Sequence, residues 1–257
     1  GTTTYRWRAE EPMAPYLMTL VVGELELVRS TLPGGTVVID AVPPEVDGSL
    51  RAELTPFPEM VAFLEERLGD YPFSAAGNVI VPGMPATALE TQTRSVLSVA
   101  ALRQDPDQLV VHELAHQWFG DSVTPTTWAD IWLNEGPAVY FQWSWAESIG
   151  GPTLEESARI SWDAADDSMD VPPGDPGEDQ MFGRAVYERS AMFLIELERL
   201  LGTEPFELLL RTWLEEHAGG NATTAEFLAL AGDVHGAPVT ALSDPWLFGD
   251  ELPELSF

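Results

Sequence analysis

Short blocks of apolar residues, separated by turn-forming residues, mark the first 50 positions of the chain. Residues 5–8 alternate between aromatic residues and arginine, residues 16–22 are almost entirely apolar, and residues 36–39 form another short apolar run. Alternation and short apolar runs of this kind are typical of β-strands. A Pro-Gly-Gly sequence at residues 33–35 predicts a turn between strands. Residues 1–50 are therefore predicted to be β-structure.

Apolar residues spaced three and four apart, which are typical of amphipathic helices, begin near residue 55. They predict a helix over residues 55–68, and two strands follow at residues 78–82 and 95–99. The rest of the chain is predicted to be mainly helical, with helices at residues 107–121, 128–149, 153–167, 205–217 and 224–234 and one that ends at residue 201. This order of strands and helices indicates an α+β fold.

The segment His-Glu-Leu-Ala-His at residues 112–116 has the spacing of a helical metal site. His112 and His116 are four residues apart, so both imidazoles can reach one ion, and Glu113 can take a proton from a water on that ion. Eighteen residues separate His116 from Glu135, which lies in a Trp-Leu-Asn-Glu-Gly sequence on the next predicted helix. Two histidines and one glutamate would leave zinc an open position for water. The weaker interpretation is that the two histidines bind no metal and that Glu135 caps or solvates a helix. It is weaker because two of the only four histidines in the chain fall on this motif.

These two segments together resemble the aminopeptidase N family of zinc metallopeptidases, in the gluzincin group. The resemblance extends over roughly residues 70–250. It implies a thermolysin-like catalytic domain at residues 51–257, with a small mixed-sheet lobe and a mainly helical lobe, and one Zn²⁺ ion per chain. It also implies that residues 1–50 are the remnant of an N-terminal β domain. In this family that domain contributes to the pocket for the substrate amine, so the missing part of the same parent protein is an expected partner.

Residues 83–93 resemble a variant of the family's GxMEN motif, which follows an edge strand of the active-site cleft. By this resemblance Glu90 takes the place of the glutamate that binds the free α-amine of the substrate. Leu89 and Thr91 stand where methionine and asparagine are usual, and a solvated glutamate at a strand edge is the alternative. Three further residues of the same segment are candidate substrate contacts: Gly83, Met84 and Ala88.

Residues 182–192 resemble the tyrosine motif of the family, in which a tyrosine precedes a basic residue by two positions. Tyr187 is therefore the candidate for a phenol that hydrogen-bonds the oxyanion during catalysis, although Ser190 stands where glycine is commoner. The alternative is an ordinary half-buried tyrosine. Asp121 and Asp130 are candidate acceptors for the imidazole N–H groups that face away from the metal, or else helix caps.

Composition excludes several partners. The chain has 42 acidic and 12 basic residues, which gives a formal net charge of −30, and all 12 basic residues are arginine. Nucleic acid and anionic membranes are therefore not expected partners. The absence of lysine fits genomic codon bias or adaptation to high salt equally well. No apolar run is long enough to predict a membrane span, and no cysteine is present. The sequence leaves the compartment open, with secreted and cytoplasmic locations both compatible.

The resemblance implies a zinc aminopeptidase that removes N-terminal residues from peptides. His112, His116 and Glu135 would bind the metal, Glu113 would act as base, and Tyr187 would stabilise the oxyanion. Two alternatives stay open at this point. With a cleft open at the amine end the chain would be an endopeptidase or a relaxed peptidase, and without turnover it would be a silent fragment that binds zinc and peptides.

Overall fold

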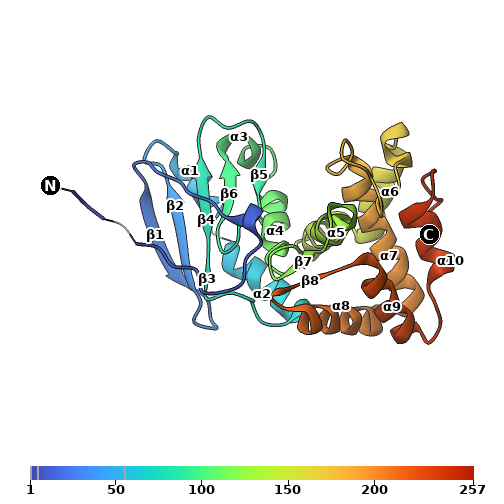
Figure 1. The fold of residues 1–257 in the computed structure, drawn as a ribbon. Coiled ribbons are helices and arrows are strands. Elements are labelled where there is room, and N and C mark those ends of the chain that lie inside the picture. Colours follow the sequence, from blue (N-terminus) through green and yellow to red (C-terminus); the bar gives the residue numbers. More distant parts are fainter. Residues whose placement is uncertain (1, 5, 55) are drawn as a thin grey trace.

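The computed structural model describes residues 2–4, 6–54 and 56–257, which form a β-sheet lobe and a helical lobe with helix α4 between them (Figure 1). The strands of the main sheet run in the order β1-β2-β4-β6-β5, and the short strand β3 pairs with β2 as well. These strands are β1 (Glu26–Thr31), β2 (Val37–Val42), β3 (Ala75–Ala76), β4 (Asn78–Val81), β5 (Ala88–Leu89) and β6 (Ser95–Ser98).

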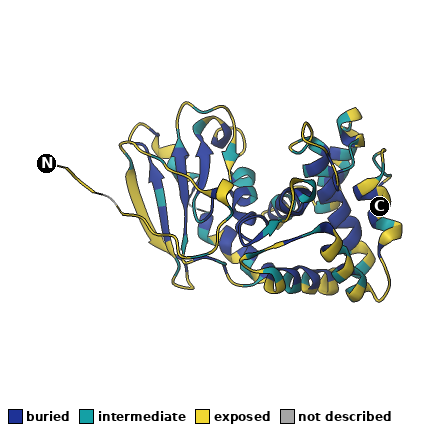
Figure 2. Cartoon of the chain, in the orientation of Figure 1, coloured by how far each residue is buried: buried dark blue, intermediate teal, exposed yellow. Residues whose placement is uncertain are grey.

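Strands β2, β4 and β6 run parallel, whereas β1 and β5 are antiparallel strands at the two edges of the sheet. β1 is exposed along its whole length, and the central strands are buried (Figure 2). β5 pairs with β6 on one side, so its other side is a sheet edge to which an extended peptide could add.

The helices pack mainly in the second lobe (Figure 1). They are α1 (Gly48–Ala52), α2 (Phe57–Leu68), α3 (Val99–Leu102), α4 (Pro106–Ala115), α5 (Trp132–Ser148), α6 (Leu154–Asp163), α7 (Ser190–Leu201), α8 (Thr203–His217), α9 (Thr224–His235) and α10 (Thr240–Ser243). Short 3₁₀ turns cover Pro15–Leu17, Trp128–Asp130 and Asp167–Asp170, and π-helical turns cover Ala185–Arg189 and Asp244–Phe248. Strands β7 (Val123–Pro125) and β8 (Gly220–Ala222) form a second, two-stranded sheet.

Side-chain caps define where several of these helices begin. The carboxylate of Asp105 accepts a hydrogen bond from the backbone N–H of Gln108, and proline at the next position suits the first turn of α4. Thr153 and Thr223 form capping boxes with the glutamates three residues later at the starts of α6 and α9. α4 is therefore fixed at its N-terminal end, which helps to set the direction of its two histidines.

Helix α5 lies at the centre of the core and is buried on nearly all sides. Its close packing against α7 depends on Gly136, because a Cβ there would lie 2.7 Å from the Cβ of Ser190. Trp132, at the start of α5, packs edge-to-face with Phe193 and Phe227, and its indole N–H donates to the hydroxyl of Thr224. These contacts fix the first turn of α5, which carries Glu135.

Most of the predicted elements are confirmed. The turn at residues 33–35 joins β1 to β2, and the predicted strands at 36–39, 78–82 and 95–99 correspond to β2, β4 and β6. α2 matches the described part of the helix predicted for residues 55–68, since residue 55 lies outside the described residues. The α+β class with a mixed sheet and a mainly helical lobe is likewise confirmed.

The strand predicted at residues 16–22 is wrong. A 3₁₀ turn ends at Leu17, and the chain then runs extended without pairing to the sheet. Leu17 is buried and Val21 packs against the small cluster of Ala41, Val79 and Val96. Met18, Leu20 and Val22 are 72%, 82% and 87% exposed, so most of this apolar run stays outside the core. The alternation at residues 5–8 also forms no strand over the described residues 6–8.

The helix that carries the histidines is shorter than predicted. α4 ends at Ala115 instead of residue 121, with His116 as its C-cap. The chain turns away because Gly120 adopts a φ of +120° and Phe119 forms an isolated bridge with Val123, at the start of β7. The two histidines therefore lie in the last turn of α4 and at its cap.

The main sheet continues across residue 50, because β2 pairs with β3 and β4 of the later part of the chain. That residues 1–50 derive from a separate β domain stays a prediction. Within the described residues, no helix has the length and apolar character needed to cross a membrane.

Candidate metal centre

His112, His116 and Glu135 come together where α4 meets the first turn of α5. The Nε2 atoms of the two histidines are 3.3 Å apart, and Glu135 Oε2 lies 3.5 Å from His112 Nε2 and 3.3 Å from His116 Nε2. Their three ligand atoms all lie within 4.8 Å of one another. Two imidazole nitrogens and one carboxylate oxygen in this arrangement can hold one transition-metal ion.

The outward-facing nitrogen of each imidazole has its own acceptor. His112 Nδ1 lies 3.1 Å from Oε1 of Gln142, and His116 Nδ1 lies 3.1 Å from the backbone carbonyl of Phe119. The amide of Gln142 is oriented in turn by donating from Nε2 to Gln108 Oε1 at 2.9 Å. Because both Nδ1 atoms face acceptors they carry hydrogens, and each Nε2 is the nitrogen that faces the candidate metal site.

Of the two interpretations of Asp121 and Asp130, acceptors for the imidazole N–H groups or helix caps, the first is wrong. Asp130 accepts from the backbone N–H of Thr224 at 3.0 Å and from its hydroxyl at 2.7 Å, so it holds the start of α9. Asp121 is buried, and among the described residues no hydrogen bond links it to either imidazole. Gln142 and a backbone carbonyl take the place that had been predicted for the two aspartates.

The electrostatics of the three ligands favour a cation between them. Burial alone would raise the pKa of Glu135, but the two histidines lower it to about 2. Burial alone would lower the pKa of His116, but Glu135 and the neighbouring carboxylates raise it to about 10. Glu135 Oε2 is also fully buried, and no donor among the described residues meets it with hydrogen-bond geometry. A buried carboxylate oxygen that faces two ring nitrogens fits a bound metal ion.

Glu113 is buried in α4 beside the metal-ligand set. Burial raises the pKa of this carboxyl to about 8; His116 opposes the shift, whereas Glu90 and Glu135 add to it. A cation on the three ligands would lower this pKa again, because it adds positive charge nearby. Glu113 can therefore accept and release a proton near neutral pH, as a general base requires.

Tyr187 projects from the π-helical turn that precedes α7 and faces His112. Its ring lies nearly parallel to that imidazole, with centroids 6.1 Å apart and an interplanar angle of 13°. Burial, and then the charges of Glu135, Glu113 and Glu90, raise the pKa of the phenol well above its ordinary value. Tyr187 therefore stays neutral and can donate a hydrogen bond beside the metal ligands.

Arg189 holds the turn that carries Tyr187. The side chain is completely buried, and its guanidinium donates to the backbone carbonyls of Trp246, Met169, Pro245 and Gly249 at 2.7–2.9 Å. Sequence reasoning used this residue only as the basic member of the tyrosine motif and missed its structural role. The available signal was a basic residue two positions after the candidate tyrosine.

Glu90 follows directly after the edge strand β5. Its backbone carbonyl accepts from Nε2 of Gln117 at 3.1 Å, and Oε1 of Gln117 accepts from the backbone N–H of Thr93 at 2.8 Å. The charge of Glu90 raises the pKa values of Glu113 and Tyr187, so its carboxylate lies near the metal ligands. Gln117, one residue after the candidate ligand His116, thus ties the Glu90 loop to the end of α4. No local sequence pattern indicated this link.

The other three residues predicted to bind substrate occupy two different places. Ala88 lies in β5 opposite Leu97, on the same edge strand that leads to Glu90. Gly83 has a φ of +76° in the exposed turn between β4 and β5. Met84, in the same turn, packs against a small apolar cluster separate from the main core, made by Ala41, Val79 and Val96. Ala88 is thus in the edge strand that leads directly to Glu90, whereas Gly83 and Met84 are in the turn before that strand.

Tyr16, which sequence reasoning placed in a strand, reaches this site from the N-terminal segment. Its hydroxyl accepts a hydrogen bond from Nδ2 of Asn134, the residue before Glu135, at 3.3 Å. Burial, and then the charges of Glu90 and Asp121, raise the pKa of the phenol. Its ring also packs on Trp128, with centroids 5.2 Å apart. These partners are more than 100 residues away in sequence, so no local pattern could have identified Tyr16.

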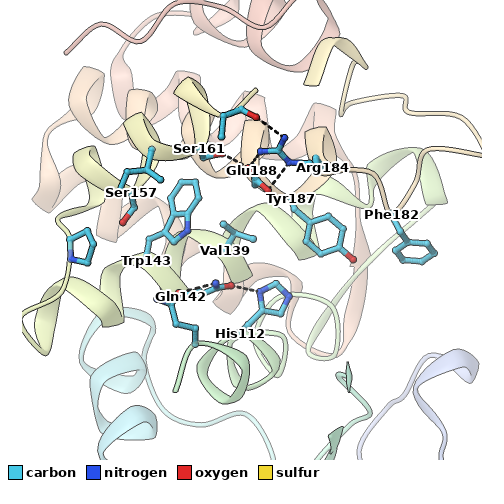
Figure 3. A pocket seen from close by; sticks show the side chains of 14 residues that line it. His112, Val139, Gln142, Trp143, Ser157, Ser161, Phe182, Arg184, Tyr187 and Glu188 are labelled. Atoms are coloured by element: carbon cyan, nitrogen blue, oxygen red, sulfur yellow. Dashed lines mark hydrogen bonds and ion pairs between the residues drawn. The ribbon is translucent and has the colours of Figure 1, made fainter. Parts of the chain in front are cut away.

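A cavity of about 570 Å³ opens beside His112 and Tyr187 (Figure 3). It lies between α5, α6 and the segment around residues 182–188, and its lining includes Val139, Trp143 and Ile160. The metal ligands are thus adjacent to a space large enough for a substrate side chain.

The family described as Peptidase family M1 domain matches residues 53–246. Among similar curated proteins, "Aminopeptidase 2, mitochondrial" of *Saccharomyces cerevisiae* is 30% identical over 268 residues, which cover 95% of this chain and 28% of the yeast protein. "Leucine aminopeptidase 2" of *Neosartorya fischeri* is 27% identical and is matched over 98% of this chain and 44% of its own length.

Solved structures of M1 zinc metallopeptidases are also similar to this chain. A two-domain M1 zinc metallopeptidase with bound L-tryptophan superposes with a TM-score of 0.87 at 27% identity, over 96% of this chain and 57% of the other. An M1 zinc metallopeptidase from *Deinococcus radiodurans* superposes with a TM-score of 0.81 at 27% identity and the same coverage. This chain therefore spans less than two thirds of the length of these proteins.

Proposed function

This chain belongs to peptidase family M1, and we propose that it is the catalytic domain of a zinc-dependent aminopeptidase that removes N-terminal residues from peptides. The observation that carries the proposal is the convergence of His112, His116 and Glu135 beside the buried carboxyl of Glu113. The aminopeptidase names of the curated relatives support the same reaction.

Zn²⁺ fits the three ligands better than a hard cation such as Mg²⁺ does, because two of the three donors are imidazole nitrogens. Nε2 of His112, Nε2 of His116 and a carboxylate oxygen of Glu135 would hold it. When bound, Zn²⁺ lowers the pKa of a coordinated water and polarises the carbonyl of the peptide bond to be cleaved.

Glu113 supplies the proton transfers. Its carboxylate takes a proton as water attacks the peptide carbonyl and returns that proton to the nitrogen of the leaving amine. Burial supports this role, because it brings the pKa of Glu113 toward neutrality. Tyr187 donates a hydrogen bond to the oxygen on which negative charge develops, and the raised pKa of its phenol keeps the proton on the donor.

Glu90 gives the proposed preference for a free N-terminus. A carboxylate at the end of the cleft binds the substrate ammonium group and penalises a blocked amine. Ala88 supports the peptide from the unpaired side of β5, and we retain Gly83 and Met84 as predicted contacts from the turn before that strand. A further domain of the parent protein would complete this end of the cleft, consistent with the 57% coverage of the two-domain relative.

The substitution Glu113→Gln tests the proposed reaction directly. Glutamine has nearly the same shape but cannot accept the proton, so turnover of a short peptide should fall by about 10²-fold or more. Zinc content should stay at one ion per chain, because Glu113 is not a ligand. A variant that keeps its activity, or a wild-type protein whose activity is insensitive to a chelator, would show that the proposed mechanism is wrong.

A further inference from the structure

The cavity beside the candidate metal ligands does not include the residue proposed to bind the substrate amine. His112 and Tyr187 contribute to its wall, whereas Glu90 lies outside it, after β5. If Glu90 binds the first residue of a peptide, the bond to be cleaved lies at the metal ligands. The side chain of the following residue is then next to the cavity. This step rests on the proposed function.

Apolar side chains make up about half of the wall of the cavity, and polar or charged side chains make up the rest. Trp143 and Val139 come from α5, Ile160 comes from α6, and Phe182 comes from the segment before Tyr187 (Figure 3). Ile160 and Phe182 are each 61% exposed, although both are large apolar side chains. A substrate side chain in the cavity would cover part of this apolar surface, which favours binding of a large apolar or aromatic residue.

The two charged residues that line the cavity are paired with each other. Nη2 of Arg184 donates to Oε2 of Glu188 at 2.6 Å, and its Nε donates to Oε1 at 3.1 Å. Glu188 also accepts a hydrogen bond from the hydroxyl of Ser161, and Arg184 donates to the carbonyl of Ala164. The bidentate pair appears in the upper part of Figure 3. Both charges are therefore neutralised by protein groups.

A charged substrate side chain would find no free counter-ion in this wall. An acidic side chain would meet the Arg184 guanidinium only by displacing Glu188. It would also approach Asp166, whose carboxylate lies 3.8 Å from Arg184, on a protein with a formal net charge of −30. A carboxylate would thus lose its hydration without a matching partner.

We propose that this cavity selects the residue that follows the cleaved bond, and that it takes large neutral side chains and rejects acidic ones because Arg184 and Glu188 neutralise each other. The substrate class is therefore peptides with an apolar or aromatic second residue.

A series of peptides with the same first residue tests the proposal in the zinc-loaded protein. The second residue is Phe, Ala, Lys or Glu, and kcat/KM is measured for each. The expected order places Phe roughly tenfold above Ala and Glu roughly tenfold below Ala, in the range that apolar pockets provide. Equal values for all four peptides would overturn the proposal while the proposed function stands. Cleavage of none of them would overturn both.

Charge variants test whether the ion pair sets this selectivity. Glu188→Gln frees the Arg184 guanidinium, so the Glu peptide should gain about tenfold relative to the Ala peptide within the same variant. Arg184→Gln frees Glu188 and should give the Lys peptide a similar relative gain. The double variant has no charge in the wall and should return to the wild-type order, which also shows that the fold tolerates both changes.

Asp163→Asn is the matched control for net charge. Asp163 is exposed at the end of α6, the helix that carries Ile160 of the cavity wall, but Asp163 itself does not line the cavity. This variant should therefore keep the wild-type order of kcat/KM values. An unchanged order in both single variants, or the same shift in Asp163→Asn as in Glu188→Gln, would overturn the role of the ion pair.

Discussion

Nδ1 of His112 lies 3.1 Å from Oε1 of Gln142, and this contact sets which nitrogen of the imidazole faces the metal site. Gln142 is two turns along α5 from Glu135, so one helix supplies both a metal ligand and the residue that orients another ligand. Nε2 of the same amide donates to Gln108, which fixes the amide with its oxygen toward the histidine.

Replacing Gln142 by alanine should therefore weaken zinc binding by about 10- to 100-fold, the usual cost of losing such a partner. A competition titration with a chelator measures the change. Gln108→Leu, which removes only the next hydrogen bond in the chain, should have a smaller effect. Equal zinc affinities in wild-type protein and Gln142→Ala would contradict the orienting role.

Arg189 should be important for stability although it does not contact the metal ligands. Replacement by methionine leaves four carbonyls without their donor, and the contacts to Trp246 and Met169 are buried. Each unsatisfied group that water cannot reach costs about 1–3 kcal/mol. We expect a loss of at least about 3 kcal/mol in the free energy of unfolding, measured by denaturant titration. Arg189→Lys should recover only part of it, because an ammonium group cannot reproduce the planar fork. A loss under about 1 kcal/mol would indicate that water satisfies these carbonyls.

Tyr187→Phe removes one hydroxyl and keeps the ring that lies against His112. Loss of an oxyanion donor typically lowers kcat by about 10²- to 10³-fold, with little change in zinc content or stability. Steady-state kinetics together with metal analysis distinguishes this effect from a packing defect. A variant with normal kcat would assign the half-buried tyrosine a structural role only.

Zinc affinity should depend on pH through His116. The carboxylates around this residue raise its pKa to about 10, so in the metal-free protein it carries a proton at neutral pH that zinc must displace. Apparent affinity should thus rise with pH, by about tenfold per unit for one released proton. Calorimetric titrations in two buffers with different ionisation enthalpies count the proton. Binding without proton release at pH 7 would show that His116 is neutral before the metal binds.

That the three candidate metal ligands come together could be predicted from the sequence, because two of them share one helix and the third lies in the next helix. A spacing of four residues on one helix fixes His112 relative to His116, and Glu135 lies in the next helix. The partners of these residues were not predictable, since Tyr16 meets Asn134 from 118 positions away and Asp130 meets Thr224 from 94 positions away. Only the tertiary packing of the chain decides such contacts.

The apolar run at residues 16–22 shows a second limit. Its composition is that of a buried strand, yet of its apolar residues only Leu17 is fully buried, and Met18 and Leu20 face outward. A strand forms only where a neighbouring strand offers its edge, and among the described residues this segment pairs with no strand. Local apolar content cannot show whether such an edge is free.

The most direct test of a zinc aminopeptidase is the hydrolysis of one short peptide with its amine either free or acetylated. Wild-type protein should cleave the free peptide, lose this activity with a chelator, and leave the acetylated peptide intact. In Glu90→Gln the preference for the free amine should fall by about tenfold or more, because the carboxylate that pairs with the ammonium group is gone. Equal cleavage of both peptides by the wild-type protein would instead indicate an endopeptidase. Cleavage of neither by a protein that holds zinc would contradict catalysis by this chain alone.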